Sequence, residues 1–451
     1  MKDLSRVLFS LSHDIVNIVR SAKVAGKIQK VATLWIRNKV SDFKYHEGGG
    51  LTFSCSHEFF VKEEWNWISI TQVIKPEIEK LPSYADAYRH ILDIYGINEA
   101  QAKFYVDRFV DRIINEVLNE NAKEEALVEI ITTFINDLEG NPLIWNAVIE
   151  VEGLLLKDEE VELAKGIKVR RPMPSDLEFE EPFGSLISLF SPLFNVPSAI
   201  IEATLRMKNL SDVLDELEKL IAALRLYKLG SIIRGRVMLR PRSVIQSQMR
   251  IGGFVEISPI IYRYSLSSED SHKIQAFLNK IKPLLPVSRG RIQIVDHVSI
   301  ALQRYNDALF KSDFVERLTY AVMGLEALFL NQQEREELAR RLAQRVAKCL
   351  SVFGYSPLEV YEIIKKSYDI RSTFVHGALI KEEKQTPVSK LADKVMEYLR
   401  ISLLMFLELE GKVKKEHLIK IIDNSLLSQE YQTKLENLIK GNCEITLMLV
   451  K

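Results

Sequence analysis

A helical hydrophobic pattern extends from about residue 266 almost to the end of the chain and limits the folds open to this half. Asp313 and Glu316 have the spacing of a capping box, ahead of apolar residues at three- and four-residue steps. Ser356 is a capping serine followed by a proline at the first helical position, and another apolar helix is predicted over 389–410. At least five helices in about 160 residues predict an antiparallel helical bundle over 266–451.

The first third of the chain changes its pattern twice. Residues 1–30 are predicted to form a short helix, and 31–72 are rich in β-branched and aromatic residues, with three consecutive glycines as a turn. Helical periodicity follows over 83–138, until the sequence Glu-Gly-Asn-Pro ends it. Residues 1–145 are therefore predicted to be an N-terminal mixed, mostly helical region with a small strand-rich part.

The central region, 146–265, mixes both patterns and is predicted to be α+β. The predicted strands, the first two separated by an acidic turn, occupy 145–156, 166–172, 197–207 (or a short helix there) and 231–242. An amphipathic helix is predicted over 211–230, with Ser211 as its cap and Gly230 as its terminating glycine. Because 451 residues are too many for one hydrophobic core, we expect an α+β multidomain protein with an all-α C-terminal part.

Composition and charge exclude several classes of protein. Hydrophobic residues make up 47% of the chain and charged residues 27%, which is typical of a soluble globular protein. No signal peptide and no apolar stretch of about 18 residues is found, so we expect no membrane contact. The three cysteines are far apart, which favours the cytoplasm. The net charge is zero, so any nucleic acid would have to be bound by local basic patches.

A string of chemically versatile side chains lies inside the helix predicted to begin at Pro357. The sequence SYDIRSTFVHGAL occupies 367–379 and contains Arg371, four intervening residues and His376. The spacing alone is a weak signal for any function. The sequence around it is much more specific.

The C-terminal part of the chain resembles a HEPN domain of the Apea-like branch. The resemblance rests on RLTYAVMGLEALFL at 317–330, the arginine-rich ELARRLAQRVAKCL at 337–350 and YDIRSTFVHG at 368–377, in that order. It covers roughly 295–440 and implies a HEPN helical bundle for the C-terminal domain.

The resemblance also implies an activity, which is cleavage of RNA without a metal or other cofactor. In active family members the arginine and the histidine, here Arg371 and His376, act together at the interface of a homodimer. Histidine can take or give a proton near neutral pH, and a guanidinium can hold two oxygens of a phosphorane. The expected product end is a 2′,3′-cyclic phosphate, and the expected setting is prokaryotic defence or growth arrest.

Neighbouring side chains are expected to support this pair. Ser372 supplies a polar group beside the arginine, Tyr368 and Asp369 orient the two catalytic residues, and Glu326 is a further supporting residue. Each of the first three has a plainer interpretation, as a surface serine, a packed tyrosine or a solvated aspartate.

Helix geometry separates the two candidate catalytic residues. At about 100° per residue, Arg371 points nearly where Val360 and Ile364 point, toward a buried or interface side. His376 is then about 140° away. Either the helix distorts near Gly377, or residues from two chains converge in a symmetric dimer.

Two other functions stay open. The domain can be a non-catalytic RNA-binding or interaction module, in which Arg371 forms a structural ion pair with Glu326 or Asp369 and His376 is an ordinary helix-terminal histidine. It can also be a sensor, in which the N-terminal region recognises an unknown trigger or partner and gates the helical domain.

One departure from a family pattern argues against one biological role, that of a toxin with a nucleotidyltransferase partner. HEPN toxins that are silenced by a nucleotidyltransferase partner carry a tyrosine two residues after the histidine. Ala378 occupies that position here, so we do not expect this chain to belong to such a pair.

A second candidate for RNA contact is the segment 219–255, which has no acidic residue. Its predicted strand contains Arg234, Arg236, Arg240 and Arg242. These four share one parity, so they would line one face of a strand as a phosphate-binding stripe. The alternative is an exposed edge strand that is protected by charge, with Pro241 blocking further pairing.

The remaining candidates are poor. Cys55 and His57 lack further ligands at metal-binding spacing, so no metal site is predicted. HEGGG at 46–50 and RIGGF at 250–254 are turns without the lysine of a phosphate loop. His297 is predicted to be a packed helix residue.

Overall fold

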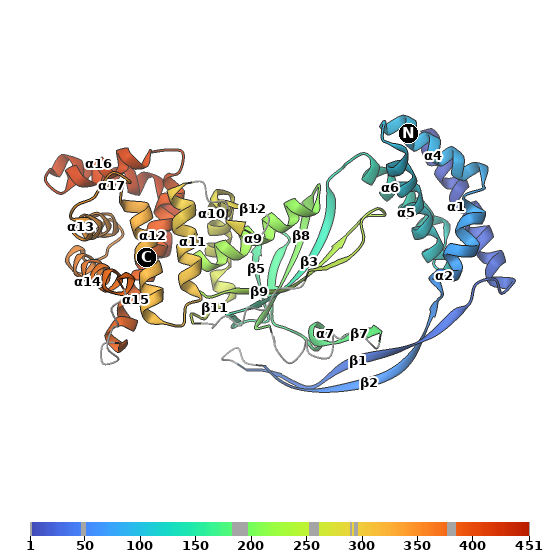
Figure 1. Cartoon of the computed structure of the whole chain (residues 1–451), viewed down its shortest axis with the longest axis horizontal. Helices are drawn as coiled ribbons and strands as arrows, with labels where there is room; N and C mark the ends of the chain where they lie inside the picture. Colours follow the sequence, from blue (N-terminus) through green and yellow to red (C-terminus); the bar gives the residue numbers. More distant parts are fainter. Residues whose placement is uncertain are drawn as a thin grey trace.

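The computed structural model describes residues 2–46, 51–182, 197–251, 261–288, 291–292, 296–376 and 385–450. The chain is a mixed α/β protein, with its described strands before residue 293 and helices making up most of the C-terminal half. Figure 1 shows N-terminal helices at one end, strands in the middle and C-terminal helices at the other end. The predicted α+β class is confirmed at this level.

The N-terminal body is built mainly from four helices. They are α1 (Lys2–Val24), α4 (Pro82–Tyr95), α5 (Glu99–Leu118) and α6 (Glu124–Leu138), with the short α2 (Trp67–Ser69), the π-helical η1 (Ile70–Ile74) and α3 (Lys75–Ile78) before α4. The Asn98 side chain accepts a hydrogen bond from the N–H of Gln101 and caps α5, while Gly96, with φ of 59°, ends α4. Their apolar faces enclose a core of their own, and the helical prediction over 83–138 is confirmed.

A long hairpin leaves this body between α1 and α2. Its strands β1 (Lys30–Tyr45) and β2 (Leu51–Trp65) pair in antiparallel fashion along nearly their whole length, and β7 (Phe179–Pro182) adds a third strand beside β1. The strand prediction for 31–72 is confirmed up to residue 65 and is wrong from residue 67, where the chain forms α2 and η1. The predicted glycine turn at 48–50 lies outside the described residues.

The central sheet has six antiparallel strands in the order β10-β9-β3-β8-β6-β5. They are β3 (Leu143–Glu152), β5 (Glu160–Ala164), β6 (Ile167–Arg170), β8 (Ala199–Met207), β9 (Ile233–Pro241) and β10 (Met249–Ile251). All four predicted strand segments contain strands, and 197–207 is a strand and not a helix. The acidic segment predicted as a turn contains β5.

Helix α9 (Leu210–Tyr227) covers one face of this sheet, where odd-numbered residues of β3 such as Trp145 and Ile149 are buried in the same core. The predicted cap Ser211 is wrong, because the Asn209 side chain accepts from the N–H of Asp212 and starts the helix one residue earlier. The terminating role of Gly230 is also wrong, since the helix ends at residue 227. A Cβ at Gly230 would lie 2.4 Å from the ring of Tyr264, so close packing requires the glycine.

The C-terminal half is helical, as predicted for 266–451. Its helices are α10 (Ser271–Ile281), α11 (His297–Leu309), α12 (Phe314–Phe329), α13 (Leu338–Ser351), α14 (Pro357–Val375), α15 (Gln385–Leu409), α16 (Lys415–Ser425), α17 (Gln429–Asn442) and α18 (Glu444–Val450). Shorter elements are β4 (Leu154–Leu156), β11 (Tyr264–Leu266), η2 (Ser268–Asp270), η3 (Lys282–Leu284), β12 (Val287–Ser288) and β13 (Arg291–Ile292). Asp313 caps α12 by accepting from two backbone N–H groups, as predicted, but Glu316 pairs with Lys311 and does not complete the predicted capping box among the described hydrogen bonds.

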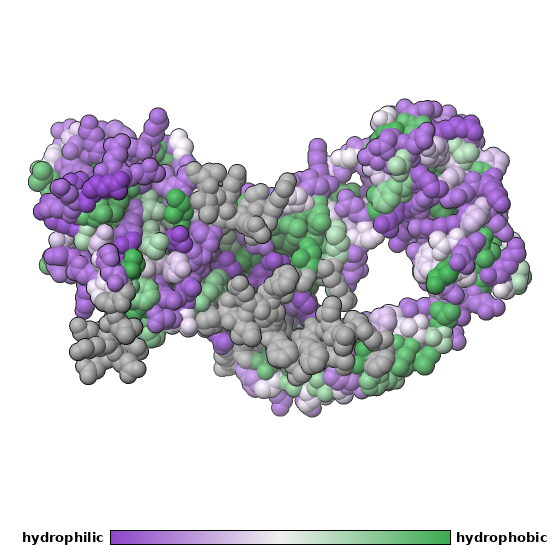
Figure 2. Space-filling model, in the orientation of Figure 1, coloured by the Kyte–Doolittle hydropathy of each residue, from purple (hydrophilic) through white to green (hydrophobic). Residues whose placement is uncertain are grey.

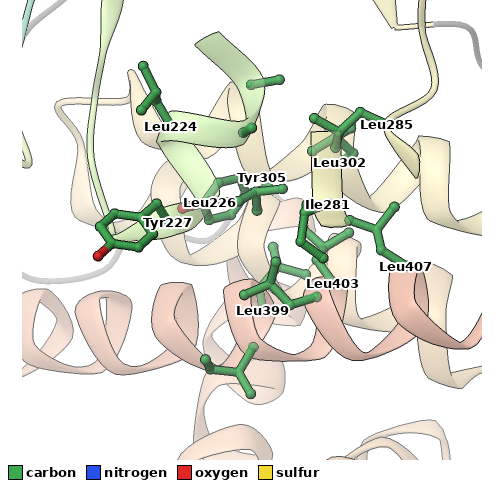
Figure 3. Close-up of a cluster of buried hydrophobic side chains, with 14 of the residues drawn as sticks. Leu224, Leu226, Tyr227, Ile281, Leu285, Leu302, Tyr305, Leu399, Leu403 and Leu407 are labelled. Atoms are coloured by element: carbon green, nitrogen blue, oxygen red, sulfur yellow. The ribbon is translucent and has the colours of Figure 1, made fainter. Parts of the chain in front are cut away.

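One hydrophobic core joins the central sheet to the C-terminal helices. Figure 3 shows side chains from α9, α10, α11 and α15 gathered there, among them Leu224, Ile281, Leu302 and Leu403. The buried Tyr305 donates from its hydroxyl to the Arg225 carbonyl at 2.8 Å. Arg400 of α15 donates to the carbonyls of Leu226 and Tyr227. The boundary placed at 265/266 from the sequence therefore falls inside one core, while the N-terminal body has another.

The N-terminal body is connected to the central sheet in two places, through the hairpin and through the end of α6. These two connections enclose an opening. Along the hairpin, Asn38 donates to the Leu177 carbonyl of α7 (Pro174–Leu177) at 3.1 Å, and the Tyr45 hydroxyl accepts from the N–H of Leu156. At the end of α6, Asp137 accepts three hydrogen bonds from residues 243–245, in the loop between β9 and β10. Figure 2 shows the opening between these parts.

Candidate functional site

Helix α14 carries the candidate residues, and its sequence explains where it begins and which side is buried. Pro357 occupies the first helical position, as predicted, but Ser356 stands at the cap without a side-chain capping bond. The predicted stripe of Val360, Ile364 and Ser367 is buried, and α14 packs against α12 and α13. This packing fixes the rotation of the helix and thus the directions of the residues in its last turns.

Arg371 turns from α14 toward α12. Its Nη2 lies 3.2 Å from Oε2 of Glu326, and its guanidinium lies 5.7 Å from the centre of the Tyr368 ring. The Nε atom is buried and has no hydrogen-bond partner within the part of the chain that the structure describes. The guanidinium is therefore held in place by Glu326 on one side, with its Nε buried.

Glu326 is the buried member of this group. Burial raises the pKa of the Glu326 carboxyl above its ordinary value, whereas the charge of Arg371 and the nearby Tyr368 hydroxyl lower it. Burial and the nearby Glu326 carboxylate raise the pKa of the Tyr368 hydroxyl, so this hydroxyl stays protonated. The three side chains thus form a connected unit that orients the guanidinium.

His376 stands at the C-terminal cap of α14 and is exposed. Its backbone N–H donates to the Ser372 carbonyl at 3.1 Å, and no hydrogen bond of its ring is found among the described residues. It directly follows Phe374 and Val375, whose side chains are 38% and 55% exposed. An exposed imidazole beside exposed apolar side chains suits a surface that another chain covers.

Arg371 and His376 do not converge within one chain. The helix continues to Val375, so the separation of about 140° expected from the sequence holds for one helix. The alternative distortion near Gly377 falls outside the described residues, as does Ala378. If the helix end is regular, an arrangement that uses both residues on one phosphate needs a second copy of the chain.

The other supporting residues are less closely connected to the pair. Asp369 is exposed, and its carbonyl accepts from the hydroxyl of Thr373 at 2.8 Å. Ser372 is half-buried, and its carbonyl accepts from the backbone of His376. Neither side chain has a hydrogen bond to Arg371 or His376 among the described contacts. Of the supporting residues, Tyr368 and Glu326 are the two that contact the candidate arginine.

The arginine-rich helix α13 contributes a structural link through Arg345. This buried side chain donates to Glu334 at 2.5 Å, to Asp423 of α16 at 2.8 Å and to the Phe329 carbonyl at 2.7 Å. Hydrogen bonds from Arg345 lower the pKa of the Glu334 carboxyl to about 2. Arg345 therefore joins α12, α13 and α16 and is not exposed to a substrate.

The predicted arginine stripe on β9 is divided between the two faces of the sheet. The register between β3 and β9 shifts between Ile149 and Val151, and a shift of one residue reverses the direction of a side chain. Arg234 accordingly lies on the helix-covered face, where it pairs with Glu218 of α9 at 2.9 Å. The prediction of a single four-arginine face is wrong at Arg234.

The other three arginines lie toward the open face, and two of them pair with carboxylates. Arg236 pairs with Glu150 at 2.6 Å, and Arg242 pairs with Glu129 at 2.6 Å. Arg240 donates to the Met238 sulfur at 3.1 Å and has no carboxylate partner among the described residues. The alternative of an edge strand does not hold over 237–239, because β10 pairs there.

Arg206 of β8 lies on the same open face and was not predicted from the sequence. It is exposed, and the described residues offer it no ion pair. The available signal was the alternation in AIIEATLRM at 199–207, where Glu202 and Thr204 share the parity of Arg206 while the residues between them are buried.

The remaining candidates have no partners for chemistry. Cys55 is exposed on β2, and His57 lies opposite Asn38 in the hairpin. His297 packs its ring edge-on against Phe406, with 5.7 Å between the ring centres. Within the described ranges, no group of three or more His, Cys, Asp or Glu side chains is placed to hold a metal ion. None of the described helices is long and apolar enough to cross a membrane.

Comparison of the chain with models of known protein families, with curated proteins and with solved structures found no match.

Proposed function

We propose that the C-terminal helices form a HEPN-type domain and that the protein is a metal-independent endoribonuclease that acts as a homodimer. The observation that carries the proposal is the arrangement on α14, where Arg371 is oriented by Glu326 and Tyr368 and His376 is exposed at the helix end. The three motif strings lie on α12, α13 and α14, which are consecutive helices packed against one another.

The dimer is part of the proposal because one chain separates the two catalytic residues. Each chain presents His376 beside the exposed Phe374 and Val375 at the end of α14. A two-fold axis near this end would bury these apolar side chains and bring the two helix ends together. Each Arg371 could then face a phosphate that a histidine also reaches.

In the proposed reaction the 2′-oxygen of a ribose attacks the adjacent phosphorus, and the bond from phosphorus to the 5′-oxygen breaks. His376 takes the proton of the attacking hydroxyl or supplies a proton to the leaving 5′-oxygen. Arg371 stabilises the added negative charge of the phosphorane. The products are a 2′,3′-cyclic phosphate on one fragment and a 5′-hydroxyl on the other.

The test is cleavage of labelled total RNA and transfer RNA in excess EDTA by the wild type and by His376→Ala. We expect a loss of about 100-fold or more in the variant, since general acid–base groups contribute on this scale. His417→Ala, which removes another exposed histidine on α16, is the matched control and should cleave like the wild type. Chemical analysis of the fragment ends then tests for the cyclic phosphate.

Equal cleavage by the wild type and a well-folded His376→Ala would contradict the proposed mechanism. Cleavage that EDTA abolishes would contradict it as well. Dimerisation is checked by sedimentation, where Val375→Glu should weaken self-association if the end of α14 forms the contact.

A second candidate is a non-catalytic RNA-binding module or a gated sensor, and it is favoured by the ion pair that already occupies Arg371. RNA binding that survives Arg371→Ala, with no cleavage by either protein, would identify a binding module. Cleavage that appears only after addition of a cellular or phage component would identify a sensor. A role in prokaryotic defence or growth arrest, in the cytoplasm, belongs to the same proposal.

A further inference from the structure

The open face of the central sheet carries a row of polar side chains that crosses three strands. Asn146 of β3 lies opposite Arg240 of β9 and Thr204 of β8, and the Thr204 hydroxyl donates to Asn146 at 3.2 Å. In the next row Ile144 lies opposite Arg206. The backbones of the two arginines are two strands apart, which is about 10 Å across a sheet.

These two arginines differ from the other cations on the same face. Arg236 and Arg170 pair with carboxylates, whereas neither Arg206 nor Arg240 has a carboxylate partner in the part of the chain that the structure describes. Both are exposed. They are therefore available to an external anion, with the Asn146 amide and the Thr204 hydroxyl as neutral hydrogen-bonding groups between them.

This face of the sheet looks toward the hairpin across the opening. Arg170 shares the face, since it pairs with Ile200 on the even-numbered side of β8, and its guanidinium reaches Asp176 of α7 at 2.7 Å. The next residue of α7, Leu177, accepts a hydrogen bond from Asn38 of the hairpin. Helix α7 thus fills one end of the space between the sheet and the hairpin, and the arginines lie at the other end.

The facing wall of the hairpin is apolar. Leu34 and Val61 are opposite each other in the register and are 43% and 64% exposed, and they share their face with Asn38. Phe59, on the same face, is 56% exposed. Figure 2 shows hydrophobic surface along the hairpin below the opening.

We propose that this opening binds a single-stranded segment of RNA, with its phosphates on Arg206 and Arg240 and its bases against the apolar wall around Leu34 and Val61. A cationic, hydrogen-bonding wall that faces an apolar and aromatic wall matches a chain with phosphates on one side and unpaired bases on the other. An acidic peptide would satisfy the arginines but not the apolar wall, and its binding instead of RNA would overturn the proposal.

The proposal rests on the proposed ribonuclease function and gives its substrate a second point of attachment. In Figure 1 the opening and α14 lie on opposite sides of the central sheet. The RNA in the opening is thus a recognition segment distinct from the phosphodiester that is cut, and short RNAs would reach one site only.

The test measures binding of a fluorescein-labelled 20-nucleotide polyuridine to the full chain by anisotropy, in a His376→Ala background so that the probe stays intact. Arg206→Glu combined with Arg240→Glu should weaken binding at least 10-fold. It should also lower the slope of log affinity against log salt by about 1.4, the value for two phosphate contacts on a single strand. Leu34→Glu combined with Val61→Glu should weaken binding too, because it places charge on the apolar wall.

The matched control is Arg20→Glu combined with Arg89→Glu, which makes the same charge change on exposed positions of α1 and α4 and should bind like the parent. Arg206→Gln with Arg240→Gln is the milder pair and replaces the charge-reversed pair if that pair fails to fold. It should lower the slope of log affinity against log salt by about half as much or more. The proposal would be overturned if the parent does not bind the polyuridine, or if neither pair of arginine substitutions changes the affinity. If the Arg206 and Arg240 substitutions weaken binding but the Leu34 and Val61 substitutions do not, the RNA lies outside the opening, and this result would overturn the proposal as well.

Failure of this proposal is distinguishable from failure of the nuclease. Binding that depends on Arg206 and Arg240, without cleavage by any protein, would leave the opening as an RNA site and remove the catalytic role of His376. Cleavage that depends on His376, with unchanged RNA binding by the arginine variants, would support the nuclease and remove the proposed RNA site in the opening.

Discussion

Arg371 and Glu326 form an ion pair that joins α14 to α12, with 3.2 Å between Nη2 and Oε2. Burial raises the pKa of the Glu326 carboxyl, and the guanidinium is the largest influence that opposes this rise. The pair therefore both orients a proposed catalytic group and neutralises a buried charge. Substitutions at the two positions can separate these roles.

Arg371→Ala should lower the stability at pH 8 by about 1–2 kcal/mol, because it leaves a largely buried carboxylate without its counter-ion. The pKa of Glu326 then rises further, so the folded state takes up a proton at a higher pH than the unfolded state does. The loss should consequently be greatest above this pKa and fade as the pH falls through it. Thermal unfolding between pH 5 and pH 8 measures the effect.

The double variant Glu326→Gln with Arg371→Ala supplies the control for that experiment. It should recover stability at pH 8 without recovering cleavage, because the buried charge is gone and the guanidinium is still missing. A destabilisation by Arg371→Ala that does not change with pH would show that Glu326 is not its source.

Glu334→Gln should destabilise the C-terminal helices at neutral pH. Arg345 lowers the pKa of Glu334 to about 2 from an ordinary value of 4.5, so the stabilisation is fully present above pH 4.5 and is lost as the pH falls toward 2. We expect a loss of about 2–3 kcal/mol at pH 7 and a much smaller loss at pH 3. Urea unfolding at the two pH values tests this, with Glu336→Gln, an exposed neighbour in the same loop, expected to have little effect.

Gly324→Ala should destabilise the contact between α12 and α15. A Cβ at Gly324 would lie 2.7 and 2.9 Å from the two methyl carbons of Leu399, which is fully buried. Overpacking of this kind costs about 1–3 kcal/mol. Gly441→Ala in α17 is the control, since no atom lies within 4 Å of its new Cβ, and it should leave stability unchanged or raise it by up to about 1 kcal/mol.

Asp137→Ala should loosen the attachment of the N-terminal body to the sheet. The Asp137 carboxylate accepts hydrogen bonds from the Ser243 hydroxyl and from the N–H groups of Val244 and Ile245. Their loss should cost about 2–3 kcal/mol and speed amide hydrogen exchange at 243–246. Glu129→Gln, which breaks the exposed pair with Arg242, should change neither quantity noticeably. Unchanged exchange in Asp137→Ala would show that this attachment does not depend on the carboxylate.

The sequence predicts best those elements whose signals are local. The cap Asp313, the proline at 357 and the alternation in 197–207 each involve residues that are neighbours along the chain, and the structure confirms all three elements. The requirement for a glycine at 230 is not local, because a side chain there would collide with the ring of Tyr264, which is distant in the sequence. A glycine required by such packing looks, in the sequence, like one that ends a helix.

The arginines of β9 show the same limit at the candidate RNA surface. Parity along a strand predicts one face, but the register shift opposite β3 turns Arg234 to the other face, and such a shift depends on how two strands pair. The carboxylates that occupy Arg236 and Arg242 also come from other elements. At α14 the sequence predicts more of the candidate site, because the angular separation of Arg371 and His376 follows from helix geometry alone.

The core that α9 shares with α11 and α15 has a consequence for how this protein can be divided or recombined. Tyr305, Leu302 and Leu403 are covered by residues from before position 266, and Arg400 is satisfied by carbonyls of α9. A chain that began at 266 would expose these apolar faces to water and remove the two carbonyl acceptors of the buried Arg400 Nη1, leaving only Glu397, among the described residues, to accept from this guanidinium. The C-terminal helices are thus not an independently folding unit, and any change that unfolds the sheet would also destabilise them.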